Sequence, residues 1–212
     1  MDQILVNNYM PNPEKVNTML LRQVAESVSK HIQEVDPEII ICSGKSSIVS
    51  AELYKATTPE LKQKKIVTFD DKLNKLTSQN LPNLESQSNS KIIVSLLQDA
   101  IPQNLRNSMD TARVLLLDEY IYSGKKAVLQ QDWLKKLGFS NVYSAFLCAL
   151  PMLDYRRLDD AINFYLEPSD FANRNIFVGE EKSSEFFNFV TNLSGKASSG
   201  HITKEEIRKL VS

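Results

Sequence analysis

The chain has 212 residues, 25 basic and 26 acidic side chains, and a formal net charge of -1. Its 42% hydrophobic and 24% charged residues are ordinary for a globular protein, which excludes a largely disordered chain. The balanced charge disfavours nucleic-acid or membrane-surface binding driven by net charge, and the length suffices for one domain with additions or for two small domains.

The two cysteines do not form a metal or disulfide pattern. Cys42 and Cys148 lie in apolar runs, without a C-x-x-C spacing and without His31 or His201 beside them. This favours buried free thiols in a reducing compartment. The first residues lack a signal-peptide pattern, and no apolar run approaches the ~18 residues of a membrane-spanning helix. We therefore expect a cytoplasmic protein without a membrane partner.

The first part of the chain predicts a long helix and then a strand, a turn and a second helix. Asn12 and Pro13 are typical of a helix start, because asparagine caps a helix and proline needs no N–H partner in the first turn. Apolar residues then recur at three- and four-residue spacing until Asp36 and Pro37 end the helix. A β-branched apolar run follows, which is typical of a buried strand. The expected elements are a helix over 13–35, a strand over 39–42, a turn over 43–47 and a helix over 48–54.

The middle of the chain predicts further strands and one more helix. Val114–Leu117 is the clearest strand, and Gly138 is the expected C′ residue of the next helix. The polar segment Thr77–Ser90 predicts a loop. Because strands alternate with helices, we expect a mostly parallel sheet. The other expected elements are strands over 66–69, 91–97 and 141–147 and a helix over 128–137.

The last part of the chain has a weaker pattern. Short strands over 163–166 and 176–178 are expected in an added subdomain. Thr191–Gly200 is rich in Ser and Gly and is expected to be a linker. The run Thr203–Glu206 is a capping box that opens a short helix ending at Val211.

Two similar loops are expected at the carboxyl ends of strands, where open parallel sheets bind ligands. Each loop contains Ser, Gly and Lys and precedes a helix, whose N-terminal N–H groups and partial positive charge attract anions. Ordinary turn chemistry explains either loop alone equally well. The run Gly44-Lys45-Ser46 is not a nucleotide P-loop, because Ile39 stands where that motif requires glycine. The candidate anion-binding residues are Ser43, Gly44 and Lys45 in the first loop and Tyr122, Ser123, Gly124, Lys125 and Lys126 in the second.

Two adjacent acids, Asp118 and Glu119, follow the strand Val114–Leu117 and come immediately before the second loop. Carboxylates at this place can accept hydrogen bonds from vicinal hydroxyls or support a magnesium ion. The alternative is a pair of solvated acids at a strand end. Because the preceding strand should be central and buried, we favour the ligand-binding interpretation.

The segment Val114–Lys126 resembles the signature of the type I phosphoribosyltransferases. That signature is four apolar residues, two acids, three mixed residues, Thr or Ser, Gly, any residue, and Thr or Ser. The sequence VLLLDEYIYSGKK matches every position except the last, where Lys126 replaces a small hydroxyl residue. Ile39–Ser47 resembles the pyrophosphate loop of this family, and residues 36–150 follow the order of its core.

The resemblance implies a role for each candidate residue. Asp118 and Glu119 would be the catalytic-site acids that hold the ribose hydroxyls of phosphoribosyl pyrophosphate. The second loop would hold the 5′-phosphate, and the first loop would hold the pyrophosphate. Mg²⁺ is the implied cofactor, held mainly through the substrate rather than directly by the protein. The implied partners are phosphoribosyl pyrophosphate and a nitrogenous base or nucleotide, with no nucleic acid, and a homo-oligomer is compatible with the family.

The implied fold is α/β, with a mostly parallel five-stranded sheet and helices on both faces. The strand at Val114 should be central, and both Ser-Gly-Lys loops should lie at the same edge of the sheet. Tyr165, Phe171 and Phe177 are candidates for stacking a base, although ordinary core packing is the better explanation for them. The expected division is an N-terminal helix and core over 1–150, a hood that selects the acceptor over 151–190, and a linker with a short helix over 191–212.

The leading functional prediction is an enzyme that transfers the 5-phosphoribosyl group to a nitrogen nucleophile and releases pyrophosphate. Tyr122 stands where some members carry an acid that assists proton transfer, and other members manage without it. Lys126 and the looser first loop favour an alternative, a regulatory protein of the same fold that binds a phosphoribosyl metabolite or nucleotide without turnover. A receiver-like signalling domain fits poorly, because its acidic pair follows the first strand rather than a late one.

Overall fold

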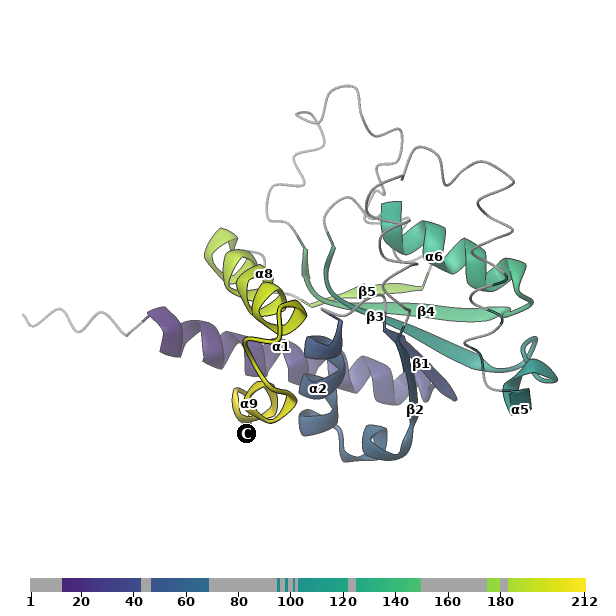
Figure 1. Ribbon diagram of the computed structural model, residues 1–212, viewed down its shortest axis with the longest axis horizontal. Coiled ribbons are helices and arrows are strands. Elements are labelled where there is room, and N and C mark those ends of the chain that lie inside the picture. The colour runs from purple at the N-terminus through teal and green to yellow at the C-terminus, as the bar shows by residue number, and fades with distance from the viewer. Residues whose placement is uncertain are drawn as a thin grey trace, which may run out of the picture.

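The computed structural model describes residues 13–42, 47–68, 95, 98, 101, 103–121, 125–149, 175–179 and 183–212. Its centre is a five-stranded sheet in the order β2-β1-β3-β4-β5, in which every neighbouring pair is parallel (Figure 1). The central position of β3 confirms the prediction for the strand at Val114. The strands are β1 (Ile39–Cys42), β2 (Lys65–Thr68), β3 (Arg113–Ile121), β4 (Asn141–Ala149) and β5 (Ile176–Val178).

Strand β1 is apolar throughout and β3 is apolar from Val114 to Leu117, because both faces of the sheet are covered. Successive side chains of a strand point to opposite faces. Ile40 and Leu115 therefore belong to one hydrophobic layer, and Ile41 and Leu116 belong to the other.

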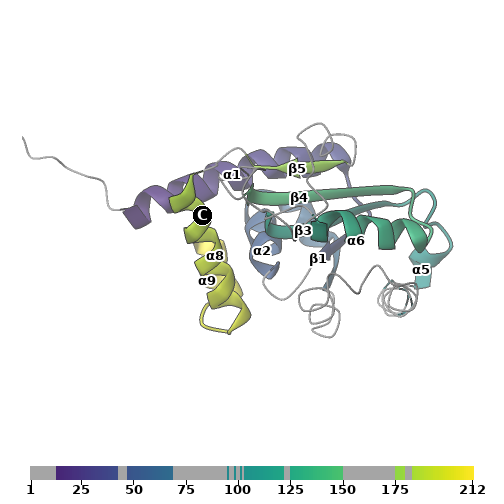
Figure 2. The ribbon, with the colours of Figure 1, turned by 90° about the horizontal axis from the view of Figure 1, so that it is seen from above.

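Helices α1, α2, α8 and α9 cover the first of these layers (Figures 1 and 2). The apolar face of α1, which includes Val24, Val28 and Ile32, packs here together with Ile207 of α9. A short 3₁₀ helix, η1 (Pro59–Gln63), connects α2 to β2. The four helices span α1 (Pro13–Val35), α2 (Ile48–Thr57), α8 (Ser184–Ser198) and α9 (Lys204–Lys209).

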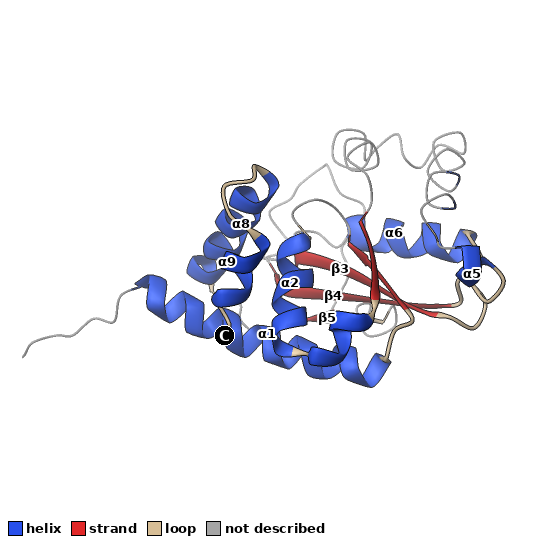
Figure 3. Ribbon diagram, turned by 60° about the horizontal axis from the view of Figure 1, so that its bottom comes forward, coloured by secondary structure: helices blue, strands red, loops and turns tan. Residues whose placement is uncertain are grey.

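The second layer is covered by α6 (Lys125–Lys136), with α5 (Gln103–Arg106) at its margin (Figure 3). Trp133 and Leu134 of α6 are buried in this layer, so helices cover both faces, as predicted. Among the described helices, none is both long and apolar enough to cross a membrane.

Helix α6 ends as the sequence predicts. Gly138 has a φ of 111°, a region in which a side chain would be strained. The N–H of the next residue, Phe139, donates to the carbonyl of Leu134 at 3.1 Å, which is the long hydrogen bond of a Schellman-type helix end. The glycine therefore turns the chain from α6 toward β4.

Three expectations about elements are wrong. Ser95, in the expected strand 91–97, is helical, since a short apolar run does not by itself distinguish a strand from a helix. The strand expected over 176–178 is confirmed as β5, but its expected place in an added subdomain is wrong, because it extends the main sheet by pairing with β4. Thr191–Gly200 is not a linker, because α8 continues to Ser198.

The helix α8 has a stripe of apolar residues that begins before the Ser- and Gly-rich segment. Phe186, Val190 and Leu193 follow each other at four- and three-residue spacing and are buried. The Ser183 side chain caps the helix by accepting from the N–H of Phe186. Packing of this stripe outweighs the weak helix propensity of the small residues that follow it. The capping box at Thr203 and the helix after it are confirmed.

Of the three aromatic residues proposed for base stacking, only Phe177 lies within the described residues. Its ring stacks on that of His31 of α1, with the ring centroids 4.4 Å apart. This contact agrees with the packing interpretation. Tyr165, Phe171, the expected strand 163–166 and the expected loop Thr77–Ser90 lie outside the described residues.

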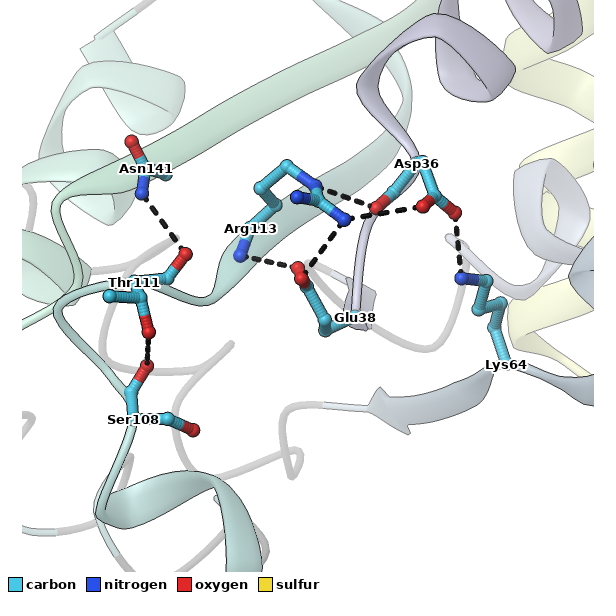
Figure 4. A network of polar contacts seen from close by, with 7 residues as sticks. All are labelled: Asp36, Glu38, Lys64, Ser108, Thr111, Arg113 and Asn141. Carbon is cyan, nitrogen blue, oxygen red and sulfur yellow. Dashed lines mark hydrogen bonds and ion pairs between the residues drawn. The ribbon is translucent and has the colours of Figure 1, made fainter.

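Ionic contacts join the end of α1 to the starting ends of three strands (Figure 4). Arg113, at the start of β3, pairs with Asp36 at 3.2 Å and with Glu38 at 3.0 Å. Lys64, just before β2, pairs with Asp36 at 2.8 Å. Asp36 therefore connects β2 and β3 to the turn that precedes β1.

Replacing Asp36 with asparagine is expected to lower the melting temperature at pH 7. The hydrogen bond from Lys64 lowers the pKa of Asp36 below its ordinary value of 3.8, so this contribution is complete above that value and is lost as the pH falls through the lowered pKa. Asparagine tolerates the φ of 44° at this position, so the change leaves the backbone in place and removes the charge and one of the two acceptor oxygens that bind Lys64 and Arg113. Thermal unfolding from pH 2 to 7 checks this, and a difference between parent and variant that does not shrink in acid would contradict it.

Candidate functional site

The structure places Asp118 and Glu119 within β3, near its carboxyl end. We expected these acids to end the strand and a loop to begin at Tyr120, but β3 continues its pairing with β4 as far as Ile121 and Ala149. Asp118 is 5% exposed and Glu119 is 2% exposed, so the alternative of two solvated acids is excluded. Buried carboxylates are rare unless other groups hold them.

Hydrogen bonds from two serines and from the backbone hold Asp118. The hydroxyl of Ser47 donates to its carboxylate Oδ1 at 3.0 Å, and the N–H of Glu119 donates to the same oxygen at 3.1 Å. The hydroxyl of Ser50 donates to the backbone carbonyl of Asp118, also at 3.0 Å. Two residues of the β1–α2 connection and the first turn of α2 therefore fix both the side chain and the backbone of this acid.

The carboxyl end of β1 lies beside β3 at the residue just before the two acids. The two strands are parallel neighbours, and Cys42 at the end of β1 is level with Leu117, the residue before Asp118. The residues that follow β1 therefore leave the sheet beside the two acids. Residues 43–46 and 122–124 lie outside the described residues, so the prediction that both Ser-Gly-Lys loops face one cleft stays a prediction.

The described residues resume at the start of the helix that follows each loop. Helix α2 follows the first loop, and α6 begins at Lys125 directly after the second. The side chains of Lys125 and Lys126 lie outside the described part of the structure. Neither of these two described helices has an acidic residue in its first turn, which leaves both N-termini favourable for anions.

The regular alternation of β3 is interrupted at the two acids. Leu115, Leu117 and then Tyr120 pack in the layer under α1 and α2, so the strand changes the parity of its faces between Leu117 and Tyr120. The pairing of β3 with β4 stays one to one on either side of the acids, so neither strand has the extra residue of a β-bulge. Sequence reasoning missed the change of parity, because the pattern of apolar residues stops at Leu117.

A second buried polar contact lies on the α6 side of the sheet. Gln131 of α6 is 0% exposed and donates its amide N–H to the hydroxyl of Ser144 on β4 at 3.0 Å. Neither this pair nor Ser47 and Ser50 was identified from the sequence. The signal for the serines was the spacing of three residues at the start of a helix, which is visible only once Asp118 is known to face that turn.

Burial keeps the Cys42 thiol, which lies beside the acids, in its unreactive protonated form. Burial raises the pKa of Cys42 to about 12, and the negative charges of Asp118 and Glu119 add to this effect. Cys42 and Cys148 are both buried and free, as predicted. A protonated buried thiol is inert.

We expect neither cysteine of the native protein to react with a thiol reagent at pH 8. With its pKa at about 12, only roughly one Cys42 in ten thousand is a thiolate at that pH. Spectrophotometric labelling should find no thiol in the native protein and both after unfolding in guanidinium chloride. Rapid labelling of the native protein would contradict the burial of these side chains.

The acids fit a magnesium ion that arrives with a phosphorylated substrate. Magnesium is commonly bound by one or two carboxylates together with substrate phosphates, and Asp118 and Glu119 supply two carboxylates. Among the described residues, no group of three or more His, Cys, Asp or Glu side chains is arranged to hold a metal ion.

Comparison of the chain with protein-family models, curated proteins and solved structures finds no match. The interpretation of the site therefore rests on its geometry and on the motif that it contains. Two buried carboxylates stand at the carboxyl edge of a parallel sheet, next to two helix N-termini. Chemically, this arrangement can accept hydrogen bonds from a diol and bind anionic groups beside it.

Proposed function

We propose that this chain binds 5-phosphoribosyl 1-pyrophosphate and transfers its phosphoribosyl group to a nitrogenous base, with release of pyrophosphate. The observation that carries the proposal is the buried pair Asp118 and Glu119 at the carboxyl edge of the central strand, beside the end of β1. The motif around this pair resembles the signature of the type I phosphoribosyltransferases. A parallel α/β sheet is the framework in which such an edge binds ligands.

The two acids suit the ribose of the substrate. An ionised carboxylate only accepts hydrogen bonds, and the vicinal hydroxyls of ribose supply two donors next to each other. Asp118 is already held by Ser47 and by the N–H of Glu119, so little ordering remains when a diol binds. Burial strengthens each of these hydrogen bonds, because little water competes for them.

The helix N-termini suit the two phosphate-bearing ends of the substrate. The β1–α2 loop, with Ser43, Gly44 and Lys45, would face the pyrophosphate, and the loop before α6 would face the 5′-phosphate. Lys125 and Lys126 stand in the first turn of α6, where the helix dipole disfavours cations unless an anion is bound. The positive charge of these lysines is therefore expected to be stabilising at this place only when an anionic ligand is bound.

In the reaction, a lone pair on the base nitrogen forms a bond to C1 of the ribose. The bond from C1 to the pyrophosphate oxygen breaks, its electron pair leaves with the pyrophosphate, and the nitrogen gives up its proton to solvent. Magnesium bound with the substrate would neutralise the charge that develops on the pyrophosphate. Asp118 and Glu119 would orient the ribose while positive charge develops on its ring.

The test is the release of pyrophosphate when the protein is incubated with phosphoribosyl pyrophosphate, magnesium and each common base in turn. Base-dependent release supports the enzyme. Lys126, which replaces a hydroxyl residue of the motif, favours a second candidate, a regulatory protein that binds the same ligand without turnover. Binding without release would identify that candidate, and neither binding nor release would contradict both.

Replacing Lys125 and Lys126 with glutamine is expected to weaken binding of ribose 5-phosphate about three- to tenfold. The unliganded variant should be as stable as the parent or slightly more stable, because each lysine opposes the helix dipole by about 0.3–1 kcal/mol. Calorimetric titration and thermal unfolding measure the two effects.

The matched control replaces Lys135 and Lys136, which lie in the last turn of the same helix. There the dipole favours cations, so this variant should lose a little stability and bind ribose 5-phosphate like the parent. Equal binding by the parent and the Lys125/Lys126 variant would show that these lysines are ordinary surface charges.

A further inference from the structure

The hydroxyl of Ser47 bonds across the fold rather than within its own helix. Ser47 directly precedes α2, and its φ of -63° and ψ of -9° are already helical, so it lacks the extended backbone that places an N-cap hydroxyl over the first turn. Here its side chain makes no capping hydrogen bond. It donates instead to Oδ1 of Asp118, a residue 71 positions away in the sequence.

The surroundings of this contact allow little freedom. Ser47 and Ser50 are both 0% exposed. The Ser50 hydroxyl holds the carbonyl of Asp118, while Ser47 and the N–H of Glu119 both donate to Oδ1. The backbone, the rotation of the side chain and the plane of the carboxylate are therefore all restrained from α2 and from β3 itself.

We infer that Ser47 is a positioning residue for Asp118: it holds the carboxylate in the orientation in which it accepts a ribose hydroxyl. The inference rests on the proposed function and assigns Ser47 no contact with the ligand. A pair of vicinal hydroxyls requires acceptors at fixed places, so rotation of the Asp118 side chain costs affinity even though its charge remains.

The experiment compares Ser47→Ala, Ser47→Thr and Asp118→Asn, alone and combined, by calorimetric titration with ribose 5-phosphate and with inorganic phosphate. Ser47→Ala should weaken ribose 5-phosphate binding about five- to twentyfold and leave phosphate binding within about twofold. Ser47→Thr retains the hydroxyl and should bind within about threefold of the parent. The double variant Ser47→Ala, Asp118→Asn should bind ribose 5-phosphate within about twofold of Asp118→Asn alone, because Ser47 acts through Asp118.

The matched control is Ser29→Ala on α1. Ser29 is also buried, and its hydroxyl also bonds to a side chain, that of Thr57 at 2.5 Å, but at a place away from the acids. This variant should bind ribose 5-phosphate like the parent. The inference is overturned if Ser47→Ala binds ribose 5-phosphate like the parent, weakens phosphate equally, or keeps its full effect beside Asp118→Asn.

A separate readout distinguishes this inference from the proposed function. If the parent binds no ribose 5-phosphate or phosphoribosyl pyrophosphate, the proposed function fails. Thermal unfolding of Ser47→Ala, Asp118→Ala and the double variant then tests whether Ser47 stabilises the Asp118 side chain. Ser47→Ala should lower the melting temperature by about 2–4 °C in the parent and by much less beside Asp118→Ala. Equal shifts in both backgrounds would overturn the inference.

Discussion

Replacing Asp118 with asparagine and Glu119 with glutamine together is expected to weaken ribose 5-phosphate binding by about 100-fold or more. A hydrogen bond to a charged group is worth about 1.5–3 kcal/mol, and each carboxylate would accept at least one from the ribose. In the proposed site, free phosphate would contact the loops rather than the acids, so its binding should stay within about threefold of the parent. Calorimetric titration with the two ligands measures this difference.

The control for the acids replaces two exposed carboxylates, Asp110→Asn and Glu34→Gln. Asp110 lies just before β3, at the end of the strand opposite to the candidate site, and Glu34 is on α1. This pair changes the net charge equally and should bind both ligands like the parent. If the variant of Asp118 and Glu119 still binds ribose 5-phosphate like this control, the two acids do not recognise the sugar.

The second large effect is expected at Glu52, a buried acid of α2. Its carboxylate is 1% exposed and pairs with Arg208 of α9 at 2.6 Å and with Lys55 at 3.5 Å. Replacing Arg208 with methionine leaves a buried carboxylate short of a partner and should cost about 2–3 kcal/mol. This lies below the usual range for a broken buried pair because Arg208 is 48% exposed. Urea unfolding of parent and variant measures the loss.

Two further variants make this prediction specific. Glu52→Gln combined with Arg208→Met removes both charges and should be more stable than Arg208→Met alone. Lys209→Met removes the neighbouring lysine, whose pair with Glu205 is exposed, and should cost less than about 0.5 kcal/mol. A loss for Arg208→Met no larger than that for Lys209→Met would show that the pair does not fasten α9 to α2.

The central part of the fold could be predicted because fully buried parallel strands have a sequence pattern of their own. The Ile39–Cys42 and Val114–Leu117 runs are continuous and apolar, and turn residues and helices surround them. Prediction failed where composition and packing disagree. In α8, the apolar stripe starting at Phe186 outweighs the small residues after it. The strand over 176–178 was predicted, but not its pairing: β5 lies at the edge of the main sheet beside β4, and no local pattern indicates that neighbour.

The sequence located the residues of the candidate site but could not predict the contacts between them. The adjacent acids and the second Ser-Gly-Lys loop lie within a few residues of each other, so the sequence alone shows their motif. The burial of Asp118 and its bond to Ser47 depend on two neighbouring strands brought together by folding. No local pattern reports a contact across 71 residues, and an N-cap serine normally indicates only a helix start.

The most direct test of the proposed phosphoribosyl site is thermal unfolding of the parent with phosphoribosyl pyrophosphate, with and without magnesium. A ligand present at 100 times its dissociation constant stabilises the native state by about 2.7 kcal/mol, which corresponds to a rise in melting temperature of roughly 5–10 °C for a chain of this length. We predict such a rise with phosphoribosyl pyrophosphate and magnesium together, a much smaller one without magnesium, and almost none in the Asp118→Asn, Glu119→Gln variant. An unchanged melting temperature at millimolar ligand and magnesium, or an equal rise with pyrophosphate alone, would contradict a phosphoribosyl site at these acids.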